Sequence, residues 1–159
     1  MALKMKMKVA NNLAKVEGNI YEGAIVDLGF GTGTRTEKNG RDIEQIEYAR
    51  FEMTATFAGT NDPIKIKTYT GVTINNEPVE VKYAGRGAKN EVPVYNRFTT
   101  LLLALGLITV DELENVDDKT LERIEKDMES LKGQVIECEI GKDKAGFYAI
   151  DLQTLKLKK

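Results

Sequence analysis

Aromatic and basic side chains are interleaved on one side of two segments that alternate in polarity, residues 43–57 and 64–72. The residues on that side are Tyr48, Arg50, Lys65, Lys67 and Tyr69. Rings can stack against bases and cations can neutralise phosphates, and a sequence-tolerant binder of single strands needs both. The same residues would suit ordinary outward positions of an antiparallel sheet. As a set, however, they predict a face that binds single-stranded nucleic acid.

Two basic stretches that contain glycine, residues 29–40 and 84–90, could extend this face. We expect both to be flexible loops that close over a bound strand. The first has the spacing G-x-G-x-G with no helical pattern behind it, which disfavours a dinucleotide or phosphate cradle. The candidate nucleic-acid-binding residues in or beside these stretches are Phe30, Arg35, Lys38, Arg41, Lys82, Tyr83, Arg86 and Lys89.

The residue types that are missing exclude several kinds of active site. The chain has no histidine, no tryptophan, a single cysteine (Cys138) and a single serine (Ser130). A Ser–His or Cys–His nucleophile pair therefore cannot be built, and neither can a Cys/His zinc site. Carboxylates could still bind Mg²⁺, but they form no compact constellation in the sequence. We expect a protein that is not an enzyme and that uses no cofactor and no metal.

Length and charge suit a small nucleic-acid-binding domain. The 159 residues predict one domain, residues 18–159, preceded by a basic arm, residues 1–17. The net charge is −2, but residues 1–100 carry +2 and residues 101–159 carry −4, so a basic face is compatible with the total. No stretch approaches the length of a membrane span and no secretory signal is evident, which predicts a cytoplasmic protein.

The most apolar stretch of the chain, residues 92–108, predicts a central helix. Pro93 suits the first helical position and Gly106 suits a left-handed residue after the last turn. One stripe would carry the apolar residues Val94, Phe98, Leu101, Leu102 and Leu105. Tyr95 and Arg97 lie off this stripe and are further candidate functional residues.

Strand patterns surround this helix. We expect strands at residues 18–28 (with a bulge or bend at Gly23), 43–57, 64–72, 79–83, 134–140 and 147–152, and a second helix at 119–131. In 43–57, Ala49, Phe51, Met53, Ala55 and Phe57 should face the core. The fold class is mainly β (α+β): an OB-fold-like antiparallel barrel with helices inserted between its third and fourth strands. A β-sandwich with inserted helices is the alternative.

Four segments resemble bacteriophage OB-fold single-stranded DNA-binding proteins, especially those of phages that infect Gram-positive bacteria. They are YEGAIVDLG, IEYARFEMTATF, VPVYNRFTTLLLALGL and LKGQVIECEIGKDKAGFYAI. The resemblance implies a protein that covers exposed single strands during phage DNA replication or recombination in the cytoplasm of the bacterial host. It also implies phage replication or recombination proteins as partners. Many relatives recruit such partners through an acidic tail, whereas this sequence ends in Leu157-Lys158-Lys159, so recruitment by that route is not expected.

Two other functions stay open at this point. The chain could be a phage protein–protein interaction module or virion component, with the acidic helix of residues 117–129 as its binding surface. An enzyme that uses carboxylates and a metal ranks last. Whether the chain forms a homo-oligomer, and whether it prefers DNA or RNA, does not follow from the sequence.

Overall fold

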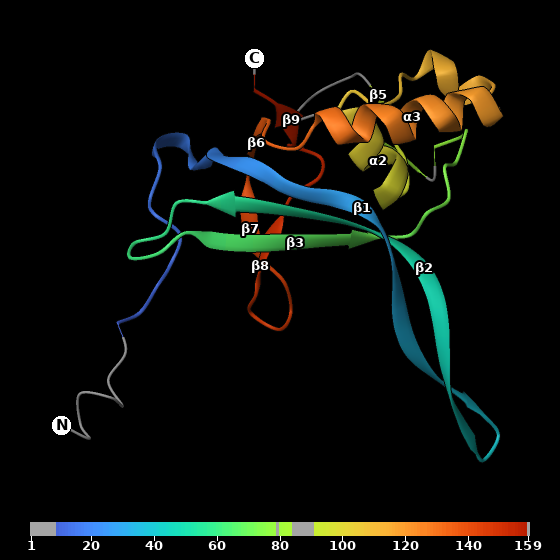
Figure 1. Cartoon of the computed structure of the whole chain (residues 1–159), viewed down its shortest axis with the longest axis horizontal. Helices are drawn as coiled ribbons and strands as arrows, with labels where there is room; N and C mark the ends of the chain where they lie inside the picture. The colour runs from blue at the N-terminus through green and yellow to red at the C-terminus, as the bar shows by residue number, and fades with distance from the viewer. Residues whose placement is uncertain (1–8, 79, 84–90, 159) are drawn as a thin grey trace.

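The computed structural model describes residues 9–78, 80–83 and 91–158, and it shows a mainly β fold (Figure 1). Its main sheet is antiparallel and has five strands in the order β3-β2-β1-β6-β9. These strands are β1 (Tyr21–Asn39), β2 (Asp42–Phe57), β3 (Ile64–Thr70), β6 (Val135–Cys138) and β9 (Lys156–Leu157). Two α-helices, α2 (Arg97–Ala104) and α3 (Asp118–Ser130), lie together on one side of the sheet.

Two small hairpins complete the fold. They are formed by β4 (Glu80–Tyr83) with β5 (Glu91–Val94), and by β7 (Ile140–Lys142) with β8 (Tyr148–Ile150). Short 3-10 turns occur at η1 (Glu17–Asn19) and η2 (Asp111–Glu114). β8 lies beside β3 without joining its hydrogen-bonded ladder, so the five-stranded sheet is not closed.

The longest feature is the β1–β2 hairpin, whose distal half projects beyond the rest of the sheet (Figure 1). Its register is continuous from Asp27↔Thr54 to Asn39↔Asp42, and Gly40, with φ +67°, begins the turn. The prediction of a flexible glycine-rich loop at residues 29–40 was therefore wrong. Residues 42–52 offer a full row of backbone partners, and glycine tolerates the extended conformation at some entropic cost.

Two details of the predicted strands also need correction. The bulge in β1 falls between Ile25 and Asp27, not at Gly23. Gly23 is instead the place where the Phe57 ring packs on the backbone, because a Cβ there would lie 2.6 Å from that ring. Ala49 shares the inward-facing side of β2 but is exposed, and it pairs with Thr32 in the distal part of the hairpin.

The central helix begins later than the sequence predicted. Pro93 is in β5, opposite Val81, and the helix starts at Arg97. Asn96 is the N-cap, and its side chain accepts a hydrogen bond from the Thr99 N–H at 2.8 Å. This bond satisfies one of the backbone N–H groups that the first turn of a helix leaves unpaired. The predicted end is confirmed, because Gly106 follows the helix with φ +70°.

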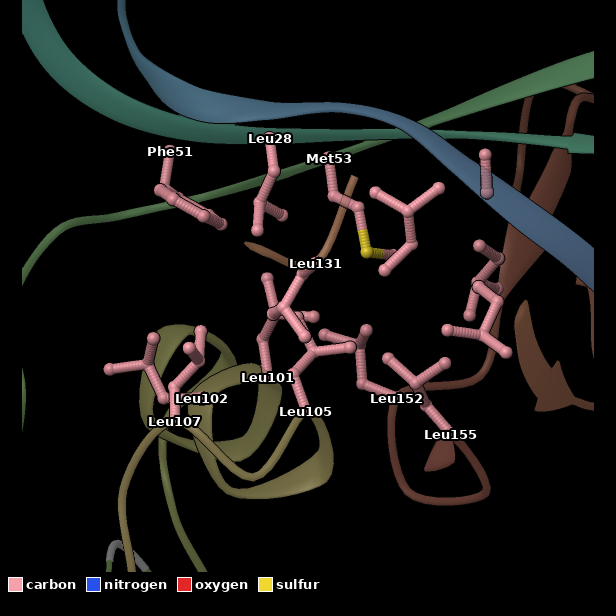
Figure 2. Close-up of a cluster of buried hydrophobic side chains, with 14 of the residues drawn as sticks. Leu28, Phe51, Met53, Leu101, Leu102, Leu105, Leu107, Leu131, Leu152 and Leu155 are labelled. Carbon is pink, nitrogen blue, oxygen red and sulfur yellow. The ribbon is translucent and has the colours of Figure 1, made fainter. Parts of the chain in front are cut away.

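The core lies between the sheet and the helices. Phe51 and Met53 of β2 and Leu28 of β1 face the leucines of α2 and the residues that follow it (Figure 2). The buried apolar stripe of α2 consists of Phe98, Leu101 and Leu102, with Leu105 just after the helix, as predicted, whereas Val94 of the predicted stripe lies in β5. Burying each such side chain contributes roughly 1.5–3 kcal/mol, so this layer fixes the position of β2 and β3. The second helix, α3, is confirmed within a residue of its predicted bounds.

The part of the predicted basic arm that the structure describes is attached to the sheet. Leu13 is buried and forms an isolated antiparallel bridge with Gly59, in the turn between β2 and β3. The Asn11 side chain accepts hydrogen bonds from the backbone N–H groups of Asn61 and Asp62. Residues 9–13 are therefore held at the end of β2 that is opposite to the projecting hairpin.

Candidate nucleic-acid interface

The aromatic and basic residues of β2 and β3 lie on the outer face of the sheet, on the side away from the core. The register places Glu52 opposite Tyr69 and Thr54 opposite Lys67, so the outward sets of both strands coincide. Tyr48 is 39% exposed and Tyr69 is 43% exposed, whereas Phe51 and Met53 on the other face are fully buried. The predicted facing of both strands is confirmed. We call the surface made by Tyr48, Arg50, Lys65, Lys67 and Tyr69 the outer face.

Arg50 lies between the two tyrosines of the outer face, two residues after Tyr48 on β2 and next to the Tyr69 ring of β3. Its Nη2 and Nε atoms both lie 2.6 Å from Oε1 of Glu52, two residues along the same strand. Its guanidinium carbon lies 4.2 Å from the centroid of the Tyr69 ring on β3, within the range of a cation–π interaction. Desolvation lowers the pKa of Arg50, but the hydrogen bond and the charge of Glu52 outweigh it and raise the pKa overall. The guanidinium is thus permanently charged and is held in place on both sides.

The glycines of β1 make room for the side chains of β2. Gly31 and Gly33 face outward, opposite Arg50 and Tyr48 in the register. A Cβ on Gly33 would lie 2.5 Å from Cζ of Tyr48, and one on Gly31 would lie 3.3 Å from the carboxylate of Glu52. The Tyr48 ring therefore rests on the bare backbone of Gly33.

The remaining cations of this surface differ in how they are paired. Arg35 is on the same side of the hairpin, where it forms an ion pair with Glu37 at 2.8 Å and lies 5.9 Å from the Tyr48 ring centroid. Lys65 and Lys67 are exposed, and within the described part of the chain neither has a carboxylate partner. These two lysines can meet a phosphate without first breaking an ion pair to a described residue.

Not every predicted site residue lies on the outer face. Phe30 and Lys38 are on the opposite side of β1, and Phe30 packs against Phe51 and Phe98 with ring centroids at 5.3 and 6.3 Å. Arg41 is in the turn at the tip of the hairpin. Lys82 and Tyr83 are in β4, while Arg86 and Lys89 fall outside the described residues.

Sequence reasoning missed Glu52, Gly31 and Gly33. The signal was present, because glycines at every second position of a strand leave one face of that strand bare.

Arg97, at the start of α2, contacts β3 next to the outer face. Its Nη2 donates a hydrogen bond to the Tyr69 carbonyl oxygen at 3.4 Å, and it lines a cleft of about 620 Å³ between the start of α2 and residues 150–153.

The described residues offer little for other kinds of chemistry. They contain no group of three or more side chains able to hold a metal ion. Burial raises the pKa of the Cys138 thiol to about 12, with a further contribution from the charge of Asp151, so this cysteine is not a nucleophile. Among the described residues, no helix is long and apolar enough to cross a membrane.

Comparison of the chain with known proteins gave no matching family model, no matching curated protein and no matching solved structure.

Proposed function

We propose that this protein binds single-stranded DNA across the outer face of β2 and β3, without marked sequence preference and without catalysis. The observation that supports this proposal is the convergence of Tyr48, Arg50, Tyr69 and the two exposed lysines, Lys65 and Lys67, on one face. Stacking on rings together with cations that follow the backbone is the general mode by which single strands are bound.

We further propose that the sheet is a partly open barrel of the OB type, an architecture that supports the same function. In this assignment the five barrel strands are β1, β2, β3, β6 and β8, with α2 and α3 inserted between β3 and β6. The contact between β3 and β8 is where such a barrel would close. OB-folds bind oligonucleotides on the face of their second and third strands and with the loop between the first two. In this chain those positions are the outer face and the projecting tip of the β1–β2 hairpin.

Each group on the outer face has a distinct role in the proposed complex. Bases stack on Tyr48 and Tyr69, and each stacked base contributes roughly 1–3 kcal/mol. Lys65 and Lys67 neutralise phosphates directly. Arg50 is already paired with Glu52, so its main role is to hold the Tyr69 ring in a fixed orientation. A phosphate can recruit Arg50 only by competing with that carboxylate.

The biological setting that we propose is phage DNA replication or recombination in the bacterial host. It rests on the resemblance of four sequence segments to phage single-stranded DNA-binding proteins. The proposed partners, phage replication or recombination proteins, rest on the same resemblance.

Fluorescence anisotropy tests the proposal. Labelled oligo-dT, oligo-rU and a duplex of equal length are titrated with the full chain at low and high salt. We expect tight binding of oligo-dT, weaker binding of the duplex, and an affinity that falls with salt with a slope of about −0.7 per phosphate contact. Preference for oligo-rU would change the substrate to RNA. If the folded protein does not bind either single strand in low salt, the proposal is wrong.

A protein–protein interaction module is the second candidate. It is favoured by a different observation, the exposed acidic surface of α3 next to an apolar groove. Because this surface is separate from the outer face, the two functions are not exclusive.

A further inference from the structure

An apolar groove lies between α3, the start of α2, residues 72–74 and the Phe30 side of β1. It has a volume of about 380 Å³ and is lined by Phe30, Val72, Ile74, Phe98, Val116, Leu121, Ile124, Glu125 and Met128. Three of its apolar side chains are well exposed: Phe30 at 54%, Leu121 at 43% and Val72 at 36%. Exposed apolar side chains gathered in one groove are typical of a surface that binds a partner.

The groove has an acidic border on one side. On α3, Leu121, Ile124 and Met128 form the apolar stripe, and the carboxylates next to it belong to Asp118, Glu122, Glu125 and Glu129 by helical spacing. Within the described part of the chain, none of these four carboxylates forms an ion pair. The groove therefore suits an occupant with apolar side chains on one side and several positive charges.

A segment of this chain has that chemistry. Residues 3–9 read Leu-Lys-Met-Lys-Met-Lys-Val, with apolar and basic residues in strict alternation. An extended backbone would turn Leu3, Met5, Met7 and Val9 to one side and the three lysines to the other. Methionine side chains adapt to irregular apolar grooves, and long lysine side chains can reach carboxylates at a groove edge.

Residues 3–9 cannot all lie in the groove of their own chain. Asn11 is held by the turn that follows β2, and Val9 can lie at most about 7 Å from it, two residues away. Phe30 pairs with Phe51, and the six-residue step from Phe51 to Phe57 along β2 covers about 20 Å, with Gly59 two residues further along the chain. Because Val9 stays near Asn11, the whole segment cannot lie in the groove of its own chain.

We propose that residues 3–9 of one copy bind in the groove of a second copy, and that two copies exchange these segments reciprocally to form a dimer. Reciprocal exchange gives a closed two-fold assembly in which both grooves are filled. The proposal is independent of nucleic-acid binding, because it uses the face of β1 opposite to the outer face.

Light scattering coupled to gel filtration tests the proposal on the full chain. We expect a mass of twice 17.7 kDa for the wild type at low salt. Two changes should each give the monomer: the double substitution Met5→Asp/Met7→Asp in the segment, and Leu121→Gln in the groove. Val110→Gln is the matched control, because Val110 is 54% exposed and does not line the groove. This control should stay dimeric.

Charge exchange gives a second, independent measurement. Glu125→Lys should weaken the dimer, and adding Lys6→Glu on the same chain should restore it.

Peptide binding gives a third measurement. A labelled peptide of residues 1–12 should bind to the Met5→Asp/Met7→Asp variant, whose groove is intact and empty of its usual segment. A monomeric wild type that does not bind this peptide would overturn the proposal and leave the groove to a different partner. So would a dimer that survives both the segment and the groove variants.

Discussion

The guanidinium carbon of Arg50 lies 4.2 Å from the centroid of the Tyr69 ring, on the neighbouring strand of the outer face. The same guanidinium is 2.6 Å from Glu52, so the three side chains form one connected unit on the surface. The ion pair holds the guanidinium that contacts the Tyr69 ring, but it also engages a positive charge that could otherwise meet a phosphate. Glu52 therefore has opposite effects on two contributions to the proposed DNA binding. It favours base stacking on Tyr69 by holding Arg50 against the ring, and it disfavours contact between Arg50 and a phosphate.

Releasing Arg50 from its carboxylate should strengthen DNA binding. In Glu52→Gln, the guanidinium is free to neutralise a phosphate, so affinity for oligo-dT should rise and the salt slope should steepen by about 0.7. Anisotropy titrations at several salt concentrations measure both quantities. Glu114→Gln, a charge removal at an exposed position on η2, is the control and should leave the slope unchanged. Equal slopes for Glu52→Gln and the wild type would show that Arg50 does not reach phosphate.

Tyr69 and Phe51 should separate binding from stability. Phe51 is fully buried, so Phe51→Ala should lower the free energy of unfolding by about 3–5 kcal/mol. Tyr69 is 43% exposed, so Tyr69→Ala should melt near the wild-type temperature and lose about 1–3 kcal/mol of binding free energy for oligo-dT. Thermal melting and titration of both variants decide the matter. Wild-type affinity in Tyr69→Ala would exclude stacking at that ring.

Gly33 and Gly29 form a matched pair on the same face of β1. Gly33→Ala places a methyl group where the Tyr48 ring lies, so the ring must swing away and affinity for oligo-dT should fall. At Gly29 a Cβ meets nothing within 4 Å, so Gly29→Ala should bind as the wild type does and be slightly more stable. Both variants are titrated with oligo-dT and melted in parallel. Equal affinity in the two variants would show that Tyr48 does not contact the strand.

The cap of α3 should make stability depend on pH in the acid range. Hydrogen bonds from the Thr120 backbone N–H and hydroxyl lower the pKa of Asp117. A carboxylate with a lowered pKa stabilises the fold above its unfolded pKa of about 3.9, and this contribution is lost as pH falls through the folded value. Asp117→Ala should therefore be less stable than the wild type at neutral pH, with the difference shrinking in acid. Asn at this position keeps an acceptor and should retain most of the neutral-pH stability, as measured by urea unfolding at several pH values.

Cys138 should be unreactive in the folded protein. Burial, with the charge of Asp151, raises its pKa to about 12, so at pH 8 almost no thiolate is present. An aromatic disulfide reagent should modify the native protein very slowly and the urea-unfolded protein at once. Since the folded pKa lies above the unfolded one, stability should also fall as pH rises above about 8.5. Rapid labelling of the native chain would show that β6 opens readily.

The sequence alone determined those features that depend on local alternation and on residue type. The side-chain period of two in β2 and β3 fixed which residues face outward, because the core side of each strand is continuously apolar or small. The presence of a second helix at residues 119–131 also followed from a local pattern. The lack of histidine excluded nucleophile pairs and zinc sites of the usual kinds through composition alone.

Tertiary structure decided the features that depend on partners distant in the chain. Residues 29–39 have the composition of a loop, but residues 42–52 give them a complete row of hydrogen-bonding partners, which outweighs the low strand propensity of glycine. Pro93 lies in β5, opposite Val81, while Asn96 starts the helix. Phe30 faces the groove beside α3 and not the outer face, because the bulge between Ile25 and Asp27 and the pairing with Phe51 set its side of the sheet. Backbone pairing across the hairpin is a long-range contact that local residue patterns do not encode.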